Sequence, residues 1–179
     1  MKTTEILIAG FGGQGILFSG KFIAYKGLLE DLQVSWLPSY GPEMRGGTAN
    51  CNVILSDTPV GSPIIIAPSV LIAMNLPSLE KYVNSVVSGG QIYVDSSLID
   101  AKVERDDVEV FYIPATQMAK DEGISSLANM IIVGHLLENH PELSFDGAAE
   151  VVEKLVPPKK AALKELNMKA LSLGKNYNK

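Results

Sequence analysis

Two glycine-rich stretches carry the residue types best suited to holding an anion. The first, GFGGQG, runs from Gly10 to Gly15, and the second, SYGPEMRGG, runs from Ser39 to Gly47. In the first, Gly10, Gly12 and Gly15 match the G-x-G-x-x-G spacing, which lets the backbone turn tightly and exposes N–H groups at a helix start. This spacing favours a phosphate-bearing ligand, and it is equally compatible with close packing of a strand, a helix or another subunit.

The second stretch combines a fixed backbone angle at Pro42 with flexible glycines, so we expect a shaped loop. It would project Tyr40, Glu43 and Arg45, of which Arg45 is the candidate anion contact. A salt bridge from Arg45 to Glu43 or to a neighbouring chain is the structural alternative. The candidate cofactor-binding residues of the two stretches are Gly10, Gly12, Gly13, Gln14, Gly15, Tyr40, Arg45, Gly46 and Gly47.

The first stretch lacks the remaining signals of two common phosphate sites. A dinucleotide site needs an acidic residue at the end of the second strand, about 20 residues after the glycines. Glu30 and Asp31 come before that strand, and its end reads LPSYG. No Gly-Lys-Ser/Thr follows the glycines, so the Walker pattern is absent. An independent dinucleotide-binding protein is therefore the alternative function and not the preferred one.

No catalytic or metal-binding set of residues emerges from the sequence. A single cysteine, Cys51, rules out an internal disulfide and a four-cysteine zinc or iron-sulfur site within this chain. His135 and His140 lack Glu or Cys partners at metal-ligand spacing. Asp95 follows a strand, where it could act as a base or could equally cap the next turn. The serines that we considered as nucleophiles, none of which has a convincing His-Asp partnership, are Ser19, Ser39, Ser96 and Ser97.

Composition indicates one folded domain over residues 1–179, with 46% apolar and 20% charged residues. The net charge of −5 argues against nucleic-acid binding. The longest apolar run, residues 63–74, is interrupted by Pro68 and is shorter than a membrane span. We expect exposed apolar surface around residues 63–68 to become covered when the chain assembles with partners. Neither a signal peptide nor a transmembrane helix is expected, which predicts a cytoplasmic protein.

Strands and helices alternate along the chain. We expect strands at 4–10, 33–37, 49–55, 69–75, 91–96 and 108–115, and helices at 16–29, 78–87, 116–122, 125–138, 147–155 and 158–173, the last closed by Gly174. This alternation predicts a three-layer α/β/α fold with a mostly parallel sheet and a Rossmann-like glycine turn after the first strand. Both glycine stretches follow strands, so they would lie together at the carboxyl ends of the sheet.

Beyond these local patterns, nearly the whole chain resembles the gamma subunit of 2-oxoacid:ferredoxin oxidoreductases. The resemblance is carried by ILIAGFGGQGILFSGK and SYGPEMRGGTANCNVILSD, and it continues through SPIIIAPSVLIAMNLPSLEKY, GGQIYVDSSLI, NMIIVG and NMKALSLG. The same module forms one domain of single-chain pyruvate:ferredoxin oxidoreductases. Among the separate gamma subunits, those of 2-oxoglutarate and branched-chain 2-oxoacid enzymes are the most similar.

The resemblance implies a non-autonomous subunit of an enzyme that oxidatively decarboxylates a 2-oxoacid with coenzyme A and reduces ferredoxin. Thiamine diphosphate and iron-sulfur clusters would belong to partner subunits of the alpha, beta and delta types. Coenzyme A is a possible ligand of this chain, because glycine-loop N–H groups and Arg45 could bind its phosphates. The alternative is that both glycine stretches pack against partner subunits, with Tyr40 and Arg45 as interface residues.

Overall fold

The structure is a computed structural model that describes residues 2–39 and 48–178. Its strands are β1 (Thr3–Phe11), β2 (Gln33–Ser39), β3 (Thr48–Ser56), β4 (Val70–Ala73), β5 (Gln91–Asp95) and β6 (Glu109–Ile113). Its α-helices are α1 (Ile16–Leu29), α2 (Leu76–Tyr82), α3 (Ala115–Asp121), α4 (Ala128–Asn139), α5 (Ala148–Leu155) and α6 (Ala161–Lys175). Short 3₁₀ segments occupy Val83–Ser85, Ser125–Leu127 and Pro158–Lys160.

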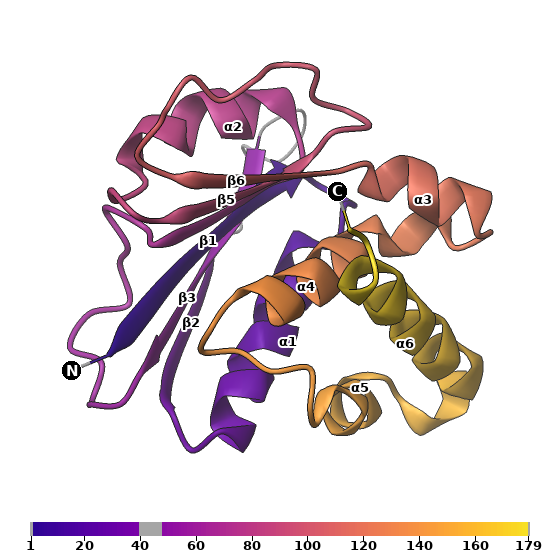
Figure 1. The fold of residues 1–179 in the computed structure, drawn as a ribbon. Helices are drawn as coiled ribbons and strands as arrows, with labels where there is room; N and C mark the ends of the chain where they lie inside the picture. Colours follow the sequence, from indigo (N-terminus) through magenta and orange to yellow (C-terminus); the bar gives the residue numbers. More distant parts are fainter. Residues whose placement is uncertain (1, 40–47, 179) are drawn as a thin grey trace.

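The six strands form one sheet in the order β2-β3-β1-β4-β5-β6 (Figure 1). β1, β4, β5 and β6 are parallel neighbours, whereas β3 is antiparallel to both β1 and β2. The predicted mostly parallel α/β sheet is therefore confirmed, with one reversed strand. Because β3 separates them, β1 and β2 run in the same direction and end at the same edge.

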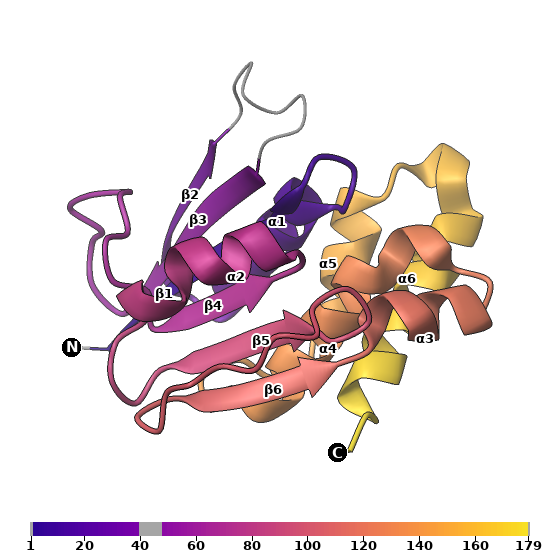
Figure 2. The same ribbon diagram turned by 90° about the horizontal axis from the view of Figure 1, so that it is seen from above.

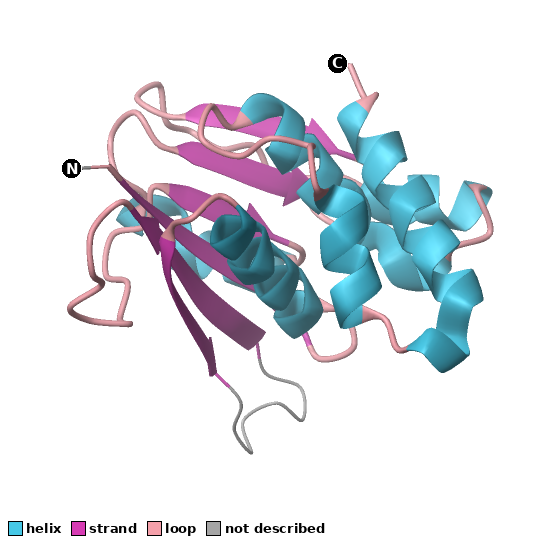
Figure 3. Cartoon of the chain, turned by 90° about the horizontal axis from the view of Figure 1, so that it is seen from below, coloured by secondary structure: helices cyan, strands magenta, loops and turns pink. Residues whose placement is uncertain are grey.

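Helices cover both faces of the sheet, which gives the three predicted layers (Figures 2 and 3). Side chains alternate across a strand, so Ile6 and Ile8 of β1 pack with the core on the side of α1, α4 and α6, while Leu7 joins the smaller core beneath α2. β4 is buried on both faces, and none of its four residues is more than 1% exposed. This burial explains why its sequence is a continuous apolar run.

The backbones of α4 and α6 approach closely at two glycines. A Cβ on Gly134 would overlap the carbonyl oxygen of Leu171, and a Cβ on Gly174 would overlap that of Ile131. The prediction that Gly174 closes the last helix was wrong, because α6 continues to Lys175 and Gly174 lies inside it. Its missing side chain serves helix packing and not a left-handed cap.

Other helix boundaries also differ from the prediction, and the helix expected at 158–173 becomes α6 only at Ala161. The helix expected at 78–87 begins at Leu76, because the Oδ1 atom of Asn75 accepts a hydrogen bond from the Ser78 N–H (2.9 Å) and caps it. The α-helix ends at Tyr82, and the 3₁₀ segment Val83–Ser85 follows it. The helix expected at 125–138 starts as a 3₁₀ turn and becomes α4 only at Ala128.

Candidate functional site

The first glycine stretch forms the turn between β1 and α1. Gly13 and Gly15 have φ angles of 91° and 76°, in the left-handed region that glycine adopts without strain. Gly15 is the N-cap residue of α1, and no side chain caps this helix. The start of α1 therefore offers uncapped N–H groups and the positive end of the helix dipole to an anion.

Gln14 holds this turn to the neighbouring strand. Its Oε1 atom accepts a hydrogen bond from the Phe11 N–H (2.6 Å), and its Nε2 atom donates to the carbonyl oxygen of Met74 (2.9 Å). Gly10 leaves room for this side chain, since a Cβ there would stand 2.6 Å from Gln14 Oε1. Of the predicted ligand residues in this turn, Gly12 and Gly13 are exposed, while Gln14 is engaged within the chain.

The hydrogen bond from Gln14 to Met74 joins the ends of the neighbouring strands β1 and β4, and the connections that follow these two strands lead to opposite sides of the sheet. α1 leads from β1 to β2 across one face, whereas α2 follows β4 on the other face and leads toward β5 on the opposite side. Open α/β sheets bind ligands in the crevice at such a switch point, outside the carboxyl ends of the strands. The glycine turn therefore occupies the position in this fold where a ligand is expected.

The second glycine stretch, with Tyr40, Glu43, Arg45, Gly46 and Gly47, lies outside the described residues. The strands on either side of it are described: Ser39 of β2 pairs with Asn50 of β3, and Ala49 pairs with Gly10. Both flanking strand ends thus lie at the sheet edge that carries the glycine turn. This agrees with the expectation that the two stretches follow strands ending at one edge.

Asparagines that the sequence prediction overlooked contribute polar groups close to this edge. Asn75 follows β4 and is 2% exposed, and its Nδ2 atom has no hydrogen-bond partner within the described part of the chain. On β3, Asn50 donates to the hydroxyl of Tyr82 (3.2 Å). Part of this signal was available in the sequence, because Asn75 comes soon after a buried apolar run, near the edge where open α/β sheets bind ligands.

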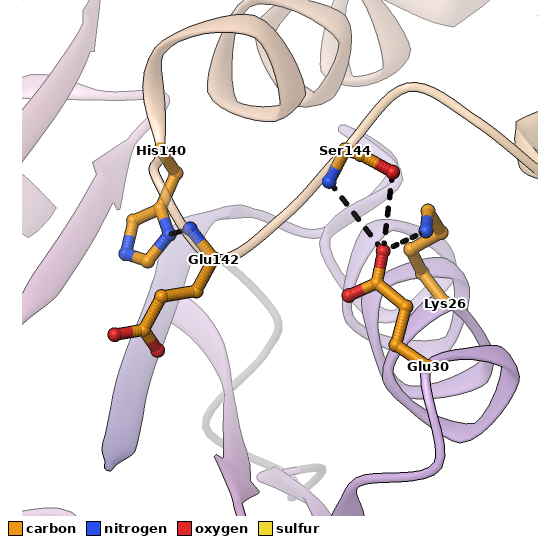
Figure 4. A network of polar contacts seen from close by, with 5 residues as sticks. All are labelled: Lys26, Glu30, His140, Glu142 and Ser144. Atoms are coloured by element: carbon orange, nitrogen blue, oxygen red, sulfur yellow. Dashed lines mark hydrogen bonds and ion pairs between the residues drawn. The ribbon is translucent and has the colours of Figure 1, made fainter.

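The acidic residues considered for a dinucleotide ribose have another role. Lys26 of α1 is only 1% exposed and forms an ion pair with Glu30, whose Oε1 atom also accepts a hydrogen bond from Ser144 Oγ (3.3 Å) (Figure 4). Glu30 is therefore committed to neutralising a buried lysine, and this weakens the dinucleotide alternative. Asp31 has a left-handed φ of 57° in the turn after α1.

A second polar group ties the N-terminus to the loop after α4. Glu142 accepts a hydrogen bond from Thr4 Oγ1 (2.6 Å) and forms an ion pair with Lys2 (3.0 Å), while its N–H donates to His140 Nδ1 (3.3 Å), as Figure 4 shows for His140. Burial raises the pKa of Glu142, but the Thr4 and Lys2 contacts outweigh it and the net shift is downward. Burial also lowers the pKa of His140.

The remaining titratable candidates are structural. Cys51 is fully buried, and burial raises the pKa of its thiol to about 12, so it is not a nucleophile near neutral pH. Asp95 accepts hydrogen bonds from the Ser97 N–H (3.1 Å) and Thr116 Oγ1 (2.6 Å), which is the turn-capping role. His135 packs edge-on against Phe111, and burial lowers its pKa.

Within residues 2–39 and 48–178, no group of His, Cys, Asp and Glu side chains could hold a metal ion. In the same part of the chain, none of the helices has both the length and the apolar character needed to cross a membrane.

The chain is similar to two archaeal oxidoreductase subunits. The chain is 40% identical over 133 residues to the ketoisovalerate oxidoreductase subunit VorA of Methanothermobacter thermautotrophicus, which covers 74% of this chain and only 28% of that protein. It is 35% identical over 178 residues to the 2-oxoglutarate synthase subunit KorC of the same organism, covering 96% of this chain and 93% of the relative. The chain therefore matches less than a third of VorA and nearly all of KorC.

Two solved structures share the fold along nearly the whole chain. The gamma subunit of a keto/oxoacid ferredoxin oxidoreductase from Geobacter sulfurreducens is 29% identical with a TM-score of 0.80, covering 96% of this chain and 95% of that one. The 2-oxoglutarate:ferredoxin oxidoreductase from Magnetococcus marinus, with 2-oxoglutarate, coenzyme A and succinyl-CoA bound, is 26% identical with a TM-score of 0.86, covering 98% of this chain and 31% of that one. The model of the pyruvate ferredoxin/flavodoxin oxidoreductase family matches residues 5–177. These matches bear out the resemblance read from the sequence, and the chain belongs to the pyruvate ferredoxin/flavodoxin oxidoreductase family.

Proposed function

We propose that the chain is the gamma subunit of a 2-oxoacid:ferredoxin oxidoreductase, in which it supports coenzyme A-dependent oxidative decarboxylation and reduction of ferredoxin. The observation that carries this proposal is the match to KorC, which runs along nearly the full length of both chains. The names of the relatives favour 2-oxoglutarate or the branched-chain ketoisovalerate as the substrate. In this proposal residues 1–179 act as one module in a cytoplasmic complex.

The chemistry would be shared with partner chains. The only cysteine in the sequence is buried with a raised pKa, so this chain cannot supply the thiolates of an iron-sulfur cluster. We propose that the clusters and thiamine diphosphate belong to alpha-, beta- and delta-type subunits. The KorC and VorA relatives are themselves named as subunits, which supports a hetero-oligomer.

One partner contact is proposed at the segment that joins β3 to β4. Ile64 and Ile66 are 63% and 84% exposed, which is unusual for two isoleucines so close together. Residues 63–68 would become covered when the subunits assemble. Hydrogen exchange of the assembled complex tests this contact, and equal exchange of residues 63–68 in the free and the assembled chain would exclude it.

Within the complex, we propose that the glycine turn contacts a phosphate of coenzyme A. The uncapped start of α1 and the exposed Gly12 and Gly13 fit an anion there, since their backbone can approach it closely. Arg45, Tyr40 and the glycines of the second stretch would contribute from the same edge. Packing of both stretches against a partner subunit is the competing interpretation, and an independent dinucleotide-binding protein remains the less favoured alternative.

The subunit assignment is tested by co-expression with and without this chain. We expect the complete complex to reduce ferredoxin in the presence of coenzyme A and either 2-oxoglutarate or ketoisovalerate, and the complex lacking this chain to be inactive or unassembled. A fully active complex without it would disprove the assignment.

The phosphate contact is tested separately with Arg45→Ala and Gly12→Val in the assembled enzyme. If Arg45 binds a phosphate, its loss should raise the coenzyme A requirement by roughly 10- to 150-fold, the equivalent of a charged hydrogen bond worth about 1.5–3 kcal/mol, and leave the 2-oxoacid requirement unchanged. Gly12→Val should have the same selectivity because a β-branched side chain blocks the approach of a phosphate. Loss of assembly, with both substrates affected, would support the partner-packing interpretation instead.

A further inference from the structure

β2 is an edge strand whose outer side has no neighbouring strand among the described residues (Figure 2). Within residues 2–39 and 48–178 it pairs with β3 alone, and β6 forms the opposite edge of the sheet. Edge strands are usually short or carry charged side chains, which discourage pairing with another chain. β6 fits this rule, because it has five residues, begins at Glu109 and follows Asp106 and Asp107. β2 does not, because its seven residues, QVSWLPS, include no charged side chain.

The pattern of hydrogen bonds in the sheet identifies the backbone groups of β2 that point away from β3. The Met74 N–H donates to the carbonyl oxygen of Ala9 (2.9 Å) on the β4 side of β1, so the preceding residue, Ile8, directs its backbone groups toward β3. Ile8 is opposite Cys51, which therefore bonds to β1 and not to β2. Pro38 is opposite Cys51 on the other side, so its backbone nitrogen and carbonyl group point to the outer edge. The missing N–H of proline therefore leaves no gap in the β2–β3 ladder.

Backbone directions alternate along a strand, so the N–H and C=O groups of Val34 and Trp36 also point to the outer edge. In the described part of the chain these groups have no strand to bond to. The side chains of Val34 and Trp36 lie on the α1 side, since they are among the nearest atoms to a Cβ built on Gly27 and on Gly20, respectively. Trp36 is 38% exposed, and Leu37, which points to the other face, is 39% exposed. The outer edge of β2 therefore combines unpaired backbone groups with apolar surface on both faces.

We infer that this edge is an interface between two copies of the chain, in which β2 pairs antiparallel with β2 of a second copy about a twofold axis at Ser35. A twofold axis lets an antiparallel edge bond to its own copy, because both strands then present the same groups to each other. The part of β2 that precedes Pro38, Gln33–Leu37, has Ser35 at its centre. In this register Val34 of each copy is opposite Trp36 of the other copy, and each such pair can exchange both of its N–H···O=C bonds.

The side chains are compatible with this register. On the α1 face each Trp36 would pack against Val34 of the other copy, and pairs of an aromatic and a β-branched residue stabilise antiparallel strands. On the opposite face Leu37 would lie beside Gln33, and Ser35 would face Ser35 of the other copy across the axis. The paired segment carries no charge, so it adds no repulsion between two chains that each have a net charge of −5. A strand of a different subunit is the other class of occupant, and the symmetric placement of the outward-facing groups about Ser35 favours a second copy.

The position of Ser35 on the axis allows a test by charge exchange in the full chain. Ser35→Lys places two positive charges directly opposite each other in the dimer, and Ser35→Glu places two negative charges there, whereas a mixture of the two variants places opposite charges there. Gln33→Lys and Gln33→Glu are the matched controls, because Gln33 lies on the same strand and face but would be opposite Leu37. Analytical ultracentrifugation and native mass spectrometry measure the association, and circular dichroism checks that each variant is folded.

We expect the wild type and both Gln33 variants to dimerise, and each Ser35 variant alone to dimerise roughly tenfold more weakly or less, because like charges at an interface repel strongly. The mixture of Ser35→Lys and Ser35→Glu should recover the association as a dimer with one copy of each. A monomeric wild type, Ser35 variants that dimerise as tightly as the Gln33 variants, or a mixture without recovery would overturn the inference.

Hydrogen exchange of the wild type tests the same interface without a substitution. The amides of Val34 and Trp36 should exchange more slowly as the protein concentration rises, because dimerisation gives them acceptors, and exchange that is independent of concentration would contradict the inference. Protection of these two amides only in the assembled oxidoreductase, with a monomeric free chain, would assign the edge to a partner subunit. That result would also overturn the inference, while the proposed role as a gamma subunit would still stand.

Discussion

Replacing Gly134 by alanine sets two opposing effects against each other in the middle of α4. Alanine is the better helix former by about 1 kcal/mol, so local propensity predicts a more stable protein. The new methyl group, however, would overlap the carbonyl oxygen of Leu171 and stand 2.7 Å from its carbonyl carbon. These are backbone atoms of α6, which cannot move aside by changing a rotamer.

The size of the effect depends on how far α4 and α6 must move apart to admit the new methyl group. Carbon atoms pack best at about 3.5–4.0 Å, so α4 and α6 would have to separate by on the order of 1 Å. Overpacking a close contact costs about 1–3 kcal/mol of unfolding free energy. We expect a cost at or above the upper end of this range, because the atoms that the new methyl group meets belong to the backbone. After subtracting the gain in helix propensity, we expect a loss of about 2 kcal/mol in the free energy of unfolding. For a chain of this length that corresponds to a melting temperature lower by about 4–8 °C.

Gly27→Ala is the matched control, because Gly27 is also a buried helix glycine. Its added Cβ would meet the side-chain ends of Leu55 and Val34, at 2.5 and 3.1 Å, and these can shift. Thermal and urea unfolding followed by circular dichroism would compare the variants with the wild type. A Gly134→Ala protein as stable as the wild type, or no less stable than Gly27→Ala, would refute the account of the α4–α6 contact.

Four shorter predictions concern particular side chains. The pKa values of His135 and His140 are lowered in the folded chain, so the unfolded chain takes up protons first as the pH falls through about 6.5. The free energy of unfolding should therefore drop between pH 7 and pH 5.5. Replacing both histidines by asparagine should make that drop smaller in thermal melts recorded across this pH range. The lowered pKa of Glu142 should add a further loss of stability below about pH 4.5, which Glu142→Gln should remove. Cys51 should resist iodoacetamide at pH 8 until the chain is unfolded, as mass spectrometry would detect. Gln14→Ala should cost about 1–3 kcal/mol of unfolding free energy, because the Phe11 N–H and the Met74 carbonyl both lose their partner.

The parts of the fold that depend on local sequence were predictable. An apolar run, the glycine spacing and a helical period identify β1, the turn and α1, because each signal lies within a few residues of the element it predicts. The reversed direction of β3 was not stated in advance, although it was within reach. Only eight residues separate β2 from β3, whereas a parallel connection needs a dozen or more.

The contacts that were missed join residues far apart in the chain. Asn129 bonds the start of α1 across 114 residues, and no pattern around either residue indicates it. Gly174 near the end of an amphipathic helix has the same local appearance whether it caps the helix or touches another one. Its role depends on Ile131 in α4, so only the three-dimensional packing distinguishes the two.

The glycines of the turn fall into two groups, and this division decides where function can be tested. Gly10 and Gly15 are required by the chain itself, because a Cβ on Gly10 would meet Gln14 and one on Gly15 would stand 2.5 Å from Asn129. Gly13 has open space around it, but its φ of 91° would strain any larger residue. Gly12 is exposed, and it is not among the described glycines with positive φ. A substitution of Gly12 that leaves the melting temperature unchanged and still raises the coenzyme A requirement would therefore report on what approaches the turn from outside, whereas the same result at Gly15 could arise from a disturbed Asn129 alone.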